Sequence, residues 1–216
     1  MSDLTNIGWR CGTDKVDSKH NFLHKPYTDL YAYYLKHLRY ASFNFLEIGI
    51  KGGNSLKMWK NYFPNATIVG IDINPDCKKY EEDNIEIYIG SQEDEKFLKS
   101  IGDKYKNFGV ILDDGSHINY MTIKSFEILN SYVTDFYIIE DLRNSYENLT
   151  KAVQKWPGMK YNKDLNPNNA KTRPDFDKVF LNLIKQMDYR RGKWTSFNFH
   201  SQMLVMEKNY SRISEG

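Results

Sequence analysis

The sequence is poor in cysteine and has no long hydrophobic run. Cys11 and Cys77 are its only cysteines, too few for a disulfide-based scaffold or a four-cysteine zinc site. Its apolar runs fall far short of the roughly 20 residues that a membrane-spanning helix needs. Polar residues follow Met1, without the basic and apolar regions of a signal peptide. We therefore expect a reduced, cytoplasmic protein that does not insert into a membrane.

The chain also lacks a strong excess of either charge. Its 216 residues include 30 Lys and Arg against 28 Asp and Glu, a net charge of +2, which argues against a general polyanion binder. Residues 1–150 carry 17 basic and 22 acidic side chains, whereas residues 151–216 carry 13 and 6. This basic carboxyl-terminal part is either an ordinary solvated surface or a lip that meets an anionic substrate. The hydrophobic content of 40% is sufficient for a sizeable core.

Short apolar runs alternate with helical patterns through the middle of the chain. The predicted strands cover residues 43–49, 67–73, 85–89, 108–113 and 136–140. Predicted helices cover residues 26–39, 54–63, 93–101, 120–129 and 176–187, with Asn54 as a candidate N-cap. Such alternation predicts an α/β protein with a doubly wound, Rossmann-like parallel sheet.

Two further strands are predicted at residues 194–200 and 203–208. Only Ser201 and Gln202 separate them, so they must form an antiparallel hairpin. We expect a single domain at 41–216, with a helical segment at 1–40 packed on it and a long polar loop or lid at 157–174. Parallel strands that end in an antiparallel hairpin resemble the class I S-adenosylmethionine-dependent methyltransferases.

A glycine-rich loop follows the first predicted strand. Its glycines are Gly49, Gly52 and Gly53, a spacing that departs from the GxGxxG fingerprint of NAD-binding proteins. Glycine lets the backbone approach a ligand closely, and the loop lies where open α/β sheets bind ligands. The loop is similar to the acid-x-Gly-x-x-x-Gly motif of methyltransferases, with Glu47, Gly49 and Gly53. An ordinary turn is the alternative.

The next two strands also end in polar residues. Asp72 ends the second strand, where a carboxylate can accept hydrogen bonds from the two ribose hydroxyls of an adenosine; a capping or turn aspartate is the alternative. Gln92 follows the third strand, where methyltransferases contact adenine, and its amide could meet the base edge. Helix capping by Ser91 explains this segment equally well.

Acidic residues gather after the fourth and fifth strands. Asp113, Asp114 and His117 follow one strand, and Glu140 and Asp141 follow the other. These strands are expected to be neighbours, so their side chains should converge at one edge of the sheet. Carboxylates are hard oxygen ligands that suit Mg²⁺, whereas one histidine is too few for a typical zinc site. A single acidic pair after a strand is usually a helix cap or a solvated turn. Two such clusters on neighbouring strand ends favour a functional site.

The two acidic segments, 113–119 and 139–146, resemble those of the metal-dependent sugar O-methyltransferases of macrolide biosynthesis, of the mycinamicin and demethylmacrocin type. They also resemble related proteins labelled cephalosporin hydroxylase or rhamnosyl O-methyltransferase. Further matching segments are 12–15, 27–31, 55–64 and 205–208. The resemblance covers roughly residues 12–146 and 194–208, with departures in a longer segment at 17–25 and at Arg143.

The resemblance implies a role for each matched residue. Mg²⁺ or another divalent cation would be bound by Asp114, Glu140 and Asp141. The general base would be His117, and the catalytic residues would be His117 and Asp114. Histidine suits the task because its unperturbed pKa is about 6.5. S-adenosylmethionine would be bound by Glu47, Gly49, Gly53, Asp72, Gln92 and Asp113, with Tyr27 and Thr28 reaching in from the amino-terminal segment. The acceptor would be a saccharide hydroxyl on a nucleotide-linked sugar, a surface or capsular glycan, or a glycosylated natural product.

Other functions are open alternatives at this point. An NAD-dependent oxidoreductase would need the GxGxxG fingerprint, which is missing. An iron hydroxylase would need a site of two histidines and one carboxylate, whereas the acidic cluster has only His117. A nucleic-acid-binding module at residues 151–216 lacks a recognition motif, so we expect no nucleic-acid partner. Tyr31, Tyr33 and Tyr34 could form a face for a homo-oligomer or be absorbed by the core.

Overall fold

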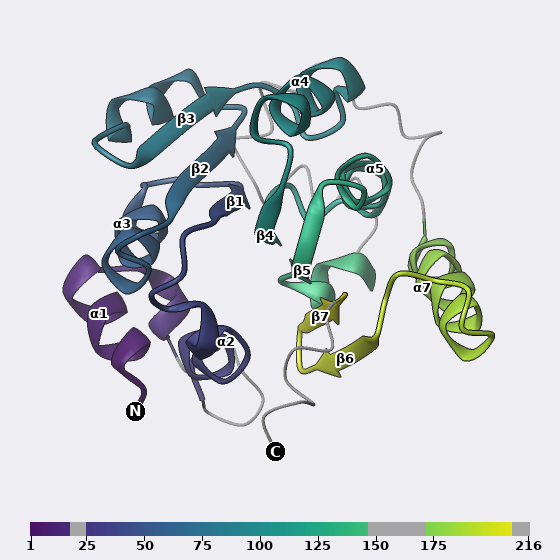
Figure 1. Ribbon diagram of the computed structural model, residues 1–216. Coiled ribbons are helices and arrows are strands. Elements are labelled where there is room, and N and C mark those ends of the chain that lie inside the picture. Colours follow the sequence, from purple (N-terminus) through teal and green to yellow (C-terminus); the bar gives the residue numbers. More distant parts are fainter. Residues whose placement is uncertain (18–24, 147–171, 209–216) are drawn as a thin grey trace.

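The computed structural model describes residues 1–17, 25–146 and 172–208 (Figure 1). Most of the loop expected at 157–174 therefore lies outside the described residues. Its last residues begin helix α7 (Arg173–Asp188), which starts with a capping box between Thr172 and Asp175. Within the described ranges, no helix is long and apolar enough to span a bilayer.

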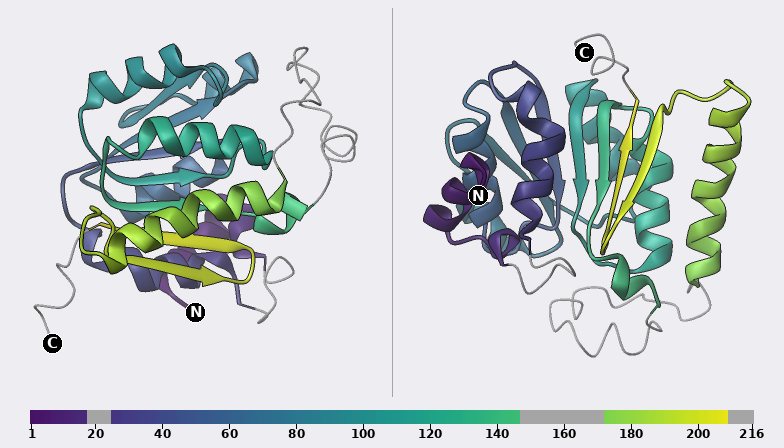
Figure 2. Two further views of the ribbon diagram at one scale, coloured as in Figure 1. Left: turned by 90° about the vertical axis from the view of Figure 1, so that its right-hand side faces the viewer. Right: turned by 90° about the horizontal axis from the view of Figure 1, so that it is seen from below.

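A seven-stranded sheet forms the centre of the molecule, in the order β3-β2-β1-β4-β5-β7-β6. Strands β1 to β5 are parallel, and β7 pairs antiparallel with both β5 and β6. The strands are β1 (Asn44–Ile48), β2 (Thr67–Asp72), β3 (Ile85–Ile89), β4 (Phe108–Asp113), β5 (Val133–Ile139), β6 (Ser196–His200) and β7 (Met203–Glu207). The hairpin extends the sheet beyond β5 (Figure 2). The predicted doubly wound sheet with a terminal antiparallel hairpin is confirmed.

Helices cover both faces of this sheet (Figure 1). On one face lie α1 (Asp3–Cys11), α2 (Tyr27–Leu35) and α3 (Asn54–Tyr62), and on the other lie α4 (Glu95–Tyr105), α5 (Asn119–Leu129) and α7. Short 3₁₀ turns are η1 (Asp14–Val16), η3 (Lys36–Leu38), η4 (Pro75–Tyr80) and η5 (Leu142–Tyr146). The helix expected over 26–39 is thus shorter, because α2 ends at Leu35 and η3 continues as a tighter turn.

Each face of the sheet has its own aromatic core. On the first face, the rings of Phe45 and Trp59 stack with centroids 4.7 Å apart. On the second, Phe126 packs edge-on against Tyr137 with centroids 5.0 Å apart and lies 5.2 Å from Phe180. A sheet covered on both sides needs strands that are apolar on both faces, which explains the runs seen in the sequence.

Helix α1 brings the segment that follows it onto the carboxyl end of the sheet. Its N-cap is Ser2, whose hydroxyl accepts a hydrogen bond from the amide of Thr5, and its C-cap is Gly12 in a left-handed conformation. Asn54 Nδ2 then donates to the Gly12 carbonyl at 3.1 Å. The expectation that Asn54 is the N-cap of α3 is wrong, because Gly53 occupies that position and Asn54 is the first helical residue.

Gly49 lets two strand ends approach each other. It follows β1 with φ +84°, and a Cβ atom there would lie 2.2 Å from the backbone oxygen of Asp114. Its amide donates to the Ile71 carbonyl at 2.8 Å. The loop after β1 therefore packs directly on the backbone after β4, which a larger residue would prevent.

Replacing Gly49 should test this close approach. In Gly49→Ala, the left-handed backbone and the clash with Asp114 should lower the free energy of unfolding by at least about 2 kcal/mol. Gly52→Ala is the matched control, because nothing lies within 4 Å of a Cβ there, and it should stay within about 0.5 kcal/mol of the wild type. Urea denaturation measures both, and equal stability of the two variants would contradict the argument.

Candidate functional site

A cavity of about 790 Å³ opens at the carboxyl ends of the parallel strands. This is where open α/β sheets bind ligands, and the volume lies within the range of small-molecule sites. Its lining comes from residues 12–15 of the amino-terminal segment, from the loops after β1 to β4, and from Asp141. Segments far apart in the sequence thus enclose one space.

The predicted site residues divide into two groups. Those that line the cavity are Gly49, Asp72, Gln92, Asp114, His117 and Asp141. Those that lie outside its lining are Tyr27, Thr28, Glu47, Gly53, Asp113 and Glu140. The second group contacts the first or supports the surrounding backbone, and its roles toward a ligand stay predictions.

Asp72 organises the glycine loop. Its Oδ2 accepts hydrogen bonds from the amides of Ile50 and Lys51 at 3.0 and 2.9 Å. Its Oδ1 accepts from the amide of Asn74 at 2.8 Å. A carboxylate has about four acceptor positions. The amides already use three of them, and the role of Asp72 toward a ribose stays a prediction.

Gln92 links the ends of β3 and β4. Its Oε1 accepts from the amide of Ser116 at 2.6 Å, and its Nε2 donates to Asp113 at 3.3 Å. Asp113 is buried and also accepts from the Ser125 hydroxyl at 2.6 Å. Burial raises the pKa of Asp113 to about 6. Both residues therefore shape the loop that carries Asp114 and His117.

Asp114, His117 and Asp141 form an acidic cluster with one imidazole on the cavity wall. One possible ligand atom from each lies within 4.8 Å of the others. His117 Nε2 is 3.8 Å from Asp114 Oδ1 and 3.6 Å from Asp141 Oδ2. His117 and Asp141 have φ values of 57° and 56°, a left-handed conformation that costs a non-glycine residue roughly 1–2 kcal/mol. Such strain is typical of functional sites.

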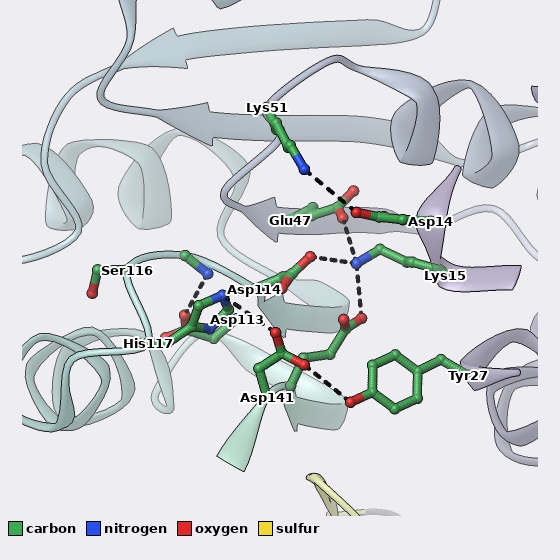
Figure 3. A network of polar contacts seen from close by, with 12 residues as sticks. Asp14, Lys15, Tyr27, Glu47, Lys51, Asp113, Asp114, Ser116, His117 and Asp141 are labelled. Atoms are coloured by element: carbon green, nitrogen blue, oxygen red, sulfur yellow. Dashed lines mark hydrogen bonds and ion pairs between the residues drawn. The ribbon is translucent and has the colours of Figure 1, made fainter. Parts of the chain in front are cut away.

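Lys15 lies beside this cluster and is buried, with 3% of its surface exposed. Its Nζ donates to Asp114 Oδ2 at 2.5 Å and to Glu140 Oε1 at 2.8 Å, and lies 3.4 Å from Glu47 Oε1 (Figure 3). Tyr31 also donates its hydroxyl to Glu140 Oε1. One ammonium group thus contacts three acids from neighbouring strands: Glu47 in β1, Asp114 after β4 and Glu140 after β5.

The buried charges shift one another's pKa. Burial lowers the pKa of Lys15, but the negative charges of Asp114, Glu140 and Glu47 outweigh this and hold it well above its usual value. Burial and the charge of Asp114 raise the pKa of Glu140, against the opposing effect of Lys15. Burial raises the pKa of Glu47 to about 7. Lys15 is therefore charged, and it favours the ionised form of its acidic neighbours.

Three residues of the second group contact other parts of the protein. Glu47 Oε2 accepts a hydrogen bond from the indole nitrogen of Trp59 at 3.1 Å, which couples it to α3. Thr28 is buried, and its hydroxyl lies 2.7 Å from that of Thr5. Tyr27 donates its hydroxyl to Asp141 Oδ1 at 3.1 Å, so it touches the cluster from behind.

Curated proteins similar to the chain are sugar O-methyltransferases. The chain is 36% identical over 153 residues to 8-demethyl-8-(2-methoxy-alpha-L-rhamnosyl)-tetracenomycin-C 3'-O-methyltransferase of Streptomyces olivaceus, which covers 67% of this chain and 38% of that protein. It is 33% identical over 194 residues to demethylmacrocin O-methyltransferase of Streptomyces fradiae, covering 86% and 43%. No family model matches the chain.

Solved structures agree with this result. The methyltransferase MycE of the mycinamycin biosynthetic pathway, in complex with Mg, SAH and mycinamycin VI, is 31% identical with a TM-score of 0.74, covering 100% of this chain and 56% of that one. The chain is a homologue of the sugar O-methyltransferases, with the class I methyltransferase fold. A putative caffeoyl-CoA O-methyltransferase from Staphylococcus aureus shares the fold at 16% identity, with a TM-score of 0.56 and coverage of 97% of this chain and 93% of that one.

This homologue spans only part of the length of its relatives. The match covers 38% of the tetracenomycin enzyme, 43% of the demethylmacrocin enzyme and 56% of MycE. The similarity therefore concerns the region that carries the sheet, the cavity and the acidic cluster.

Sequence reasoning assigns neither Lys15 nor Tyr31 a role in the site. Both lie in segments that resemble the family, 12–15 and 27–31, but neither residue type by itself indicates a contact with the acids after β4 and β5. Lys15 precedes its partner Asp114 by 99 positions in the chain. Only the packing of α1 and α2 on the sheet brings these donors to the acids.

The raised pKa of Asp113 predicts a pH-dependent stability. Its folded pKa of about 6 exceeds the unfolded value of about 3.9, so the folded protein binds the extra proton. The stabilisation is complete below about pH 4 and is lost as pH rises through 6, by on the order of 3 kcal/mol. We expect urea titrations between pH 4 and 7.5 to show a smaller loss of stability in Asp113→Asn than in the wild type. Parallel pH profiles would refute the assignment.

Proposed function

We propose that the chain is an S-adenosylmethionine-dependent O-methyltransferase that transfers a methyl group to a saccharide hydroxyl with the help of a divalent cation. One observation carries the proposal: a single cavity joins the glycine loop and Asp72 to the cluster of Asp114, His117 and Asp141. A methyl donor and an activated hydroxyl must meet in such a space, because methyl transfer from a sulfonium is an in-line displacement.

The cofactor would lie along the loops after β1, β2 and β3. Gly49 allows a close backbone approach, and Asp72 lines the cavity at the end of β2, where its carboxylate would accept from a ribose hydroxyl. The related MycE binds SAH, the product left after S-adenosylmethionine has given up its methyl group. Its 31% identity over this region favours the same cofactor here.

The donor set fits a hard divalent cation such as Mg²⁺. Asp114 and Asp141 expose carboxylate oxygens to the cavity, and Glu140 lies directly behind them. We propose these three acids as the metal ligands, because oxygen ligands suit Mg²⁺. When bound, a divalent cation lowers the pKa of a coordinated hydroxyl and positions it.

His117 is the proposed general base. Its Nε2 faces Asp114 Oδ1 and Asp141 Oδ2 at 3.8 and 3.6 Å, so two carboxylates would stabilise the imidazolium that forms when it accepts the proton of the acceptor hydroxyl. The left-handed backbone of His117 directs the ring to this wall of the cavity.

The acceptor class follows from the relatives. Two of their names describe O-methylation of a glycosylated compound, a rhamnosyl tetracenomycin and an olivosyl oleandolide, which favours a sugar attached to a natural product. A nucleotide-linked sugar and a surface or capsular glycan offer the same kind of hydroxyl and are the other acceptors to test.

Cofactor binding is the first prediction of this proposal. Calorimetric titration with S-adenosylmethionine or SAH, each with and without Mg²⁺, should give micromolar dissociation constants, whereas NAD should not bind because the GxGxxG spacing is missing. Binding of NAD alone would overturn the cofactor assignment and favour an oxidoreductase.

The proposed base gives a second prediction. His117→Ala should bind SAH as well as the wild type does but lose about 10²–10⁴-fold in turnover, the usual contribution of a general base. Transfer of radiolabelled methyl groups to a panel of deoxysugar glycosides measures turnover. His37→Ala is the control, because His37 packs on Phe136 outside the cavity lining. Full activity of the His117 variant would remove this residue from the mechanism.

A further inference from the structure

We infer that the amino-terminal segment positions the carboxylates of the candidate metal site, with Lys15, Tyr27 and Tyr31 each donating to one oxygen of an acid. The inference rests on the proposed metal site and assigns it an outer layer of positioning residues. None of the three is itself a proposed ligand. All three lie ahead of the first strand, on η1 and α2.

Asp141 shows the arrangement most clearly. The Tyr27 hydroxyl donates to Asp141 Oδ1 at 3.1 Å, while Asp141 Oδ2 faces His117 Nε2 at 3.6 Å (Figure 3). Tyr27 is 4% exposed. One oxygen is thus held by a buried donor, and the other is directed to the centre of the cluster.

Asp114 repeats this pattern. Lys15 Nζ donates to Asp114 Oδ2 at 2.5 Å, while Asp114 Oδ1 faces His117 at 3.8 Å. Glu140 receives both Lys15 and the Tyr31 hydroxyl on the same oxygen, Oε1. Each proposed ligand therefore has one oxygen bound by the amino-terminal segment.

The donors are themselves held firmly. Tyr27 and Tyr31 are one turn apart on α2, and the Tyr31 ring packs edge-on against Trp59 with centroids 5.2 Å apart. Next to Tyr27, the Thr28 hydroxyl contacts Thr5 of α1 at 2.7 Å. The helices α1 and α2 thus fix the donors independently of any bound ligand.

Such donors have a physical purpose at a metal site. A carboxylate that rotates freely must be ordered when a cation binds, and neighbouring carboxylates repel one another until then. Hydrogen bonds from the amino-terminal segment order the carboxylates in advance, and the charge of Lys15 reduces the repulsion between Asp114 and Glu140. Loss of an outer partner typically weakens metal binding by about 10–100-fold.

Tyr27→Phe tests the inference, because it removes the hydroxyl and keeps the ring. Mn²⁺ serves as the probe, with its free concentration followed by electron paramagnetic resonance and Mg²⁺ measured by competition. We expect Mn²⁺ affinity to fall by about 10–100-fold, with unchanged SAH affinity in metal-free buffer. Tyr33→Phe is the matched control on the same helix: Tyr33 is 65% exposed, so its variant should bind Mn²⁺ like the wild type.

Tyr31→Phe provides a second variant if Tyr27→Phe does not fold, and it should weaken Mn²⁺ binding through Glu140. Folded variants that bind Mn²⁺ as tightly as the wild type would overturn the inference and leave the proposed function standing. A lower melting temperature with unchanged Mn²⁺ affinity would show a purely structural role and overturn it too. A wild-type protein that binds no divalent cation would overturn the metal site itself, and the inference with it.

Discussion

The structure depends on one buried positive charge. The ammonium of Lys15 lies among the carboxylates of Glu47, Asp114 and Glu140, at the point where β1, β4 and β5 end side by side. Buried carboxylates without a cation would repel one another and become protonated, and removing one partner of a buried ion pair costs about 3–5 kcal/mol. The lysine makes an acidic sheet edge compatible with folding, and it binds the segment after α1 to the same edge.

Much of the sheet can be predicted from the sequence, because a strand covered on both faces must be apolar at most positions. Residues 85–89 and 108–113 have the predicted bounds, and the short link at 201–202 requires the hairpin. The pattern of α1 is less informative. Its buried Leu4 and Ile7 depend on packing against α3. Because Gly53 is the N-cap of α3, the side chain of Asn54 can donate a hydrogen bond to the Gly12 carbonyl.

The site is predictable as a location but not in its details. Parallel strands end at a common edge, so the acids after β4 and β5 had to gather there. Where each side chain points depends on partners that are remote in sequence: Glu47 faces Trp59 and Lys15, and Asp72 binds the amides of its own glycine loop. A pattern of residue types identifies groups that suit a chemistry, whereas the fold decides which of them reach the cavity and which support it.

The position of β7 has a consequence for the order in which the protein is assembled. Ile139 of β5 pairs with Leu204 of β7, so during synthesis β5 has an open edge until β7 leaves the ribosome. Unpaired edges of hydrophobic strands are templates for association between chains, and pairings between distant segments form slowly. The nascent chain is therefore most exposed to aggregation in this interval, and a chaperone that shields β5 would act there.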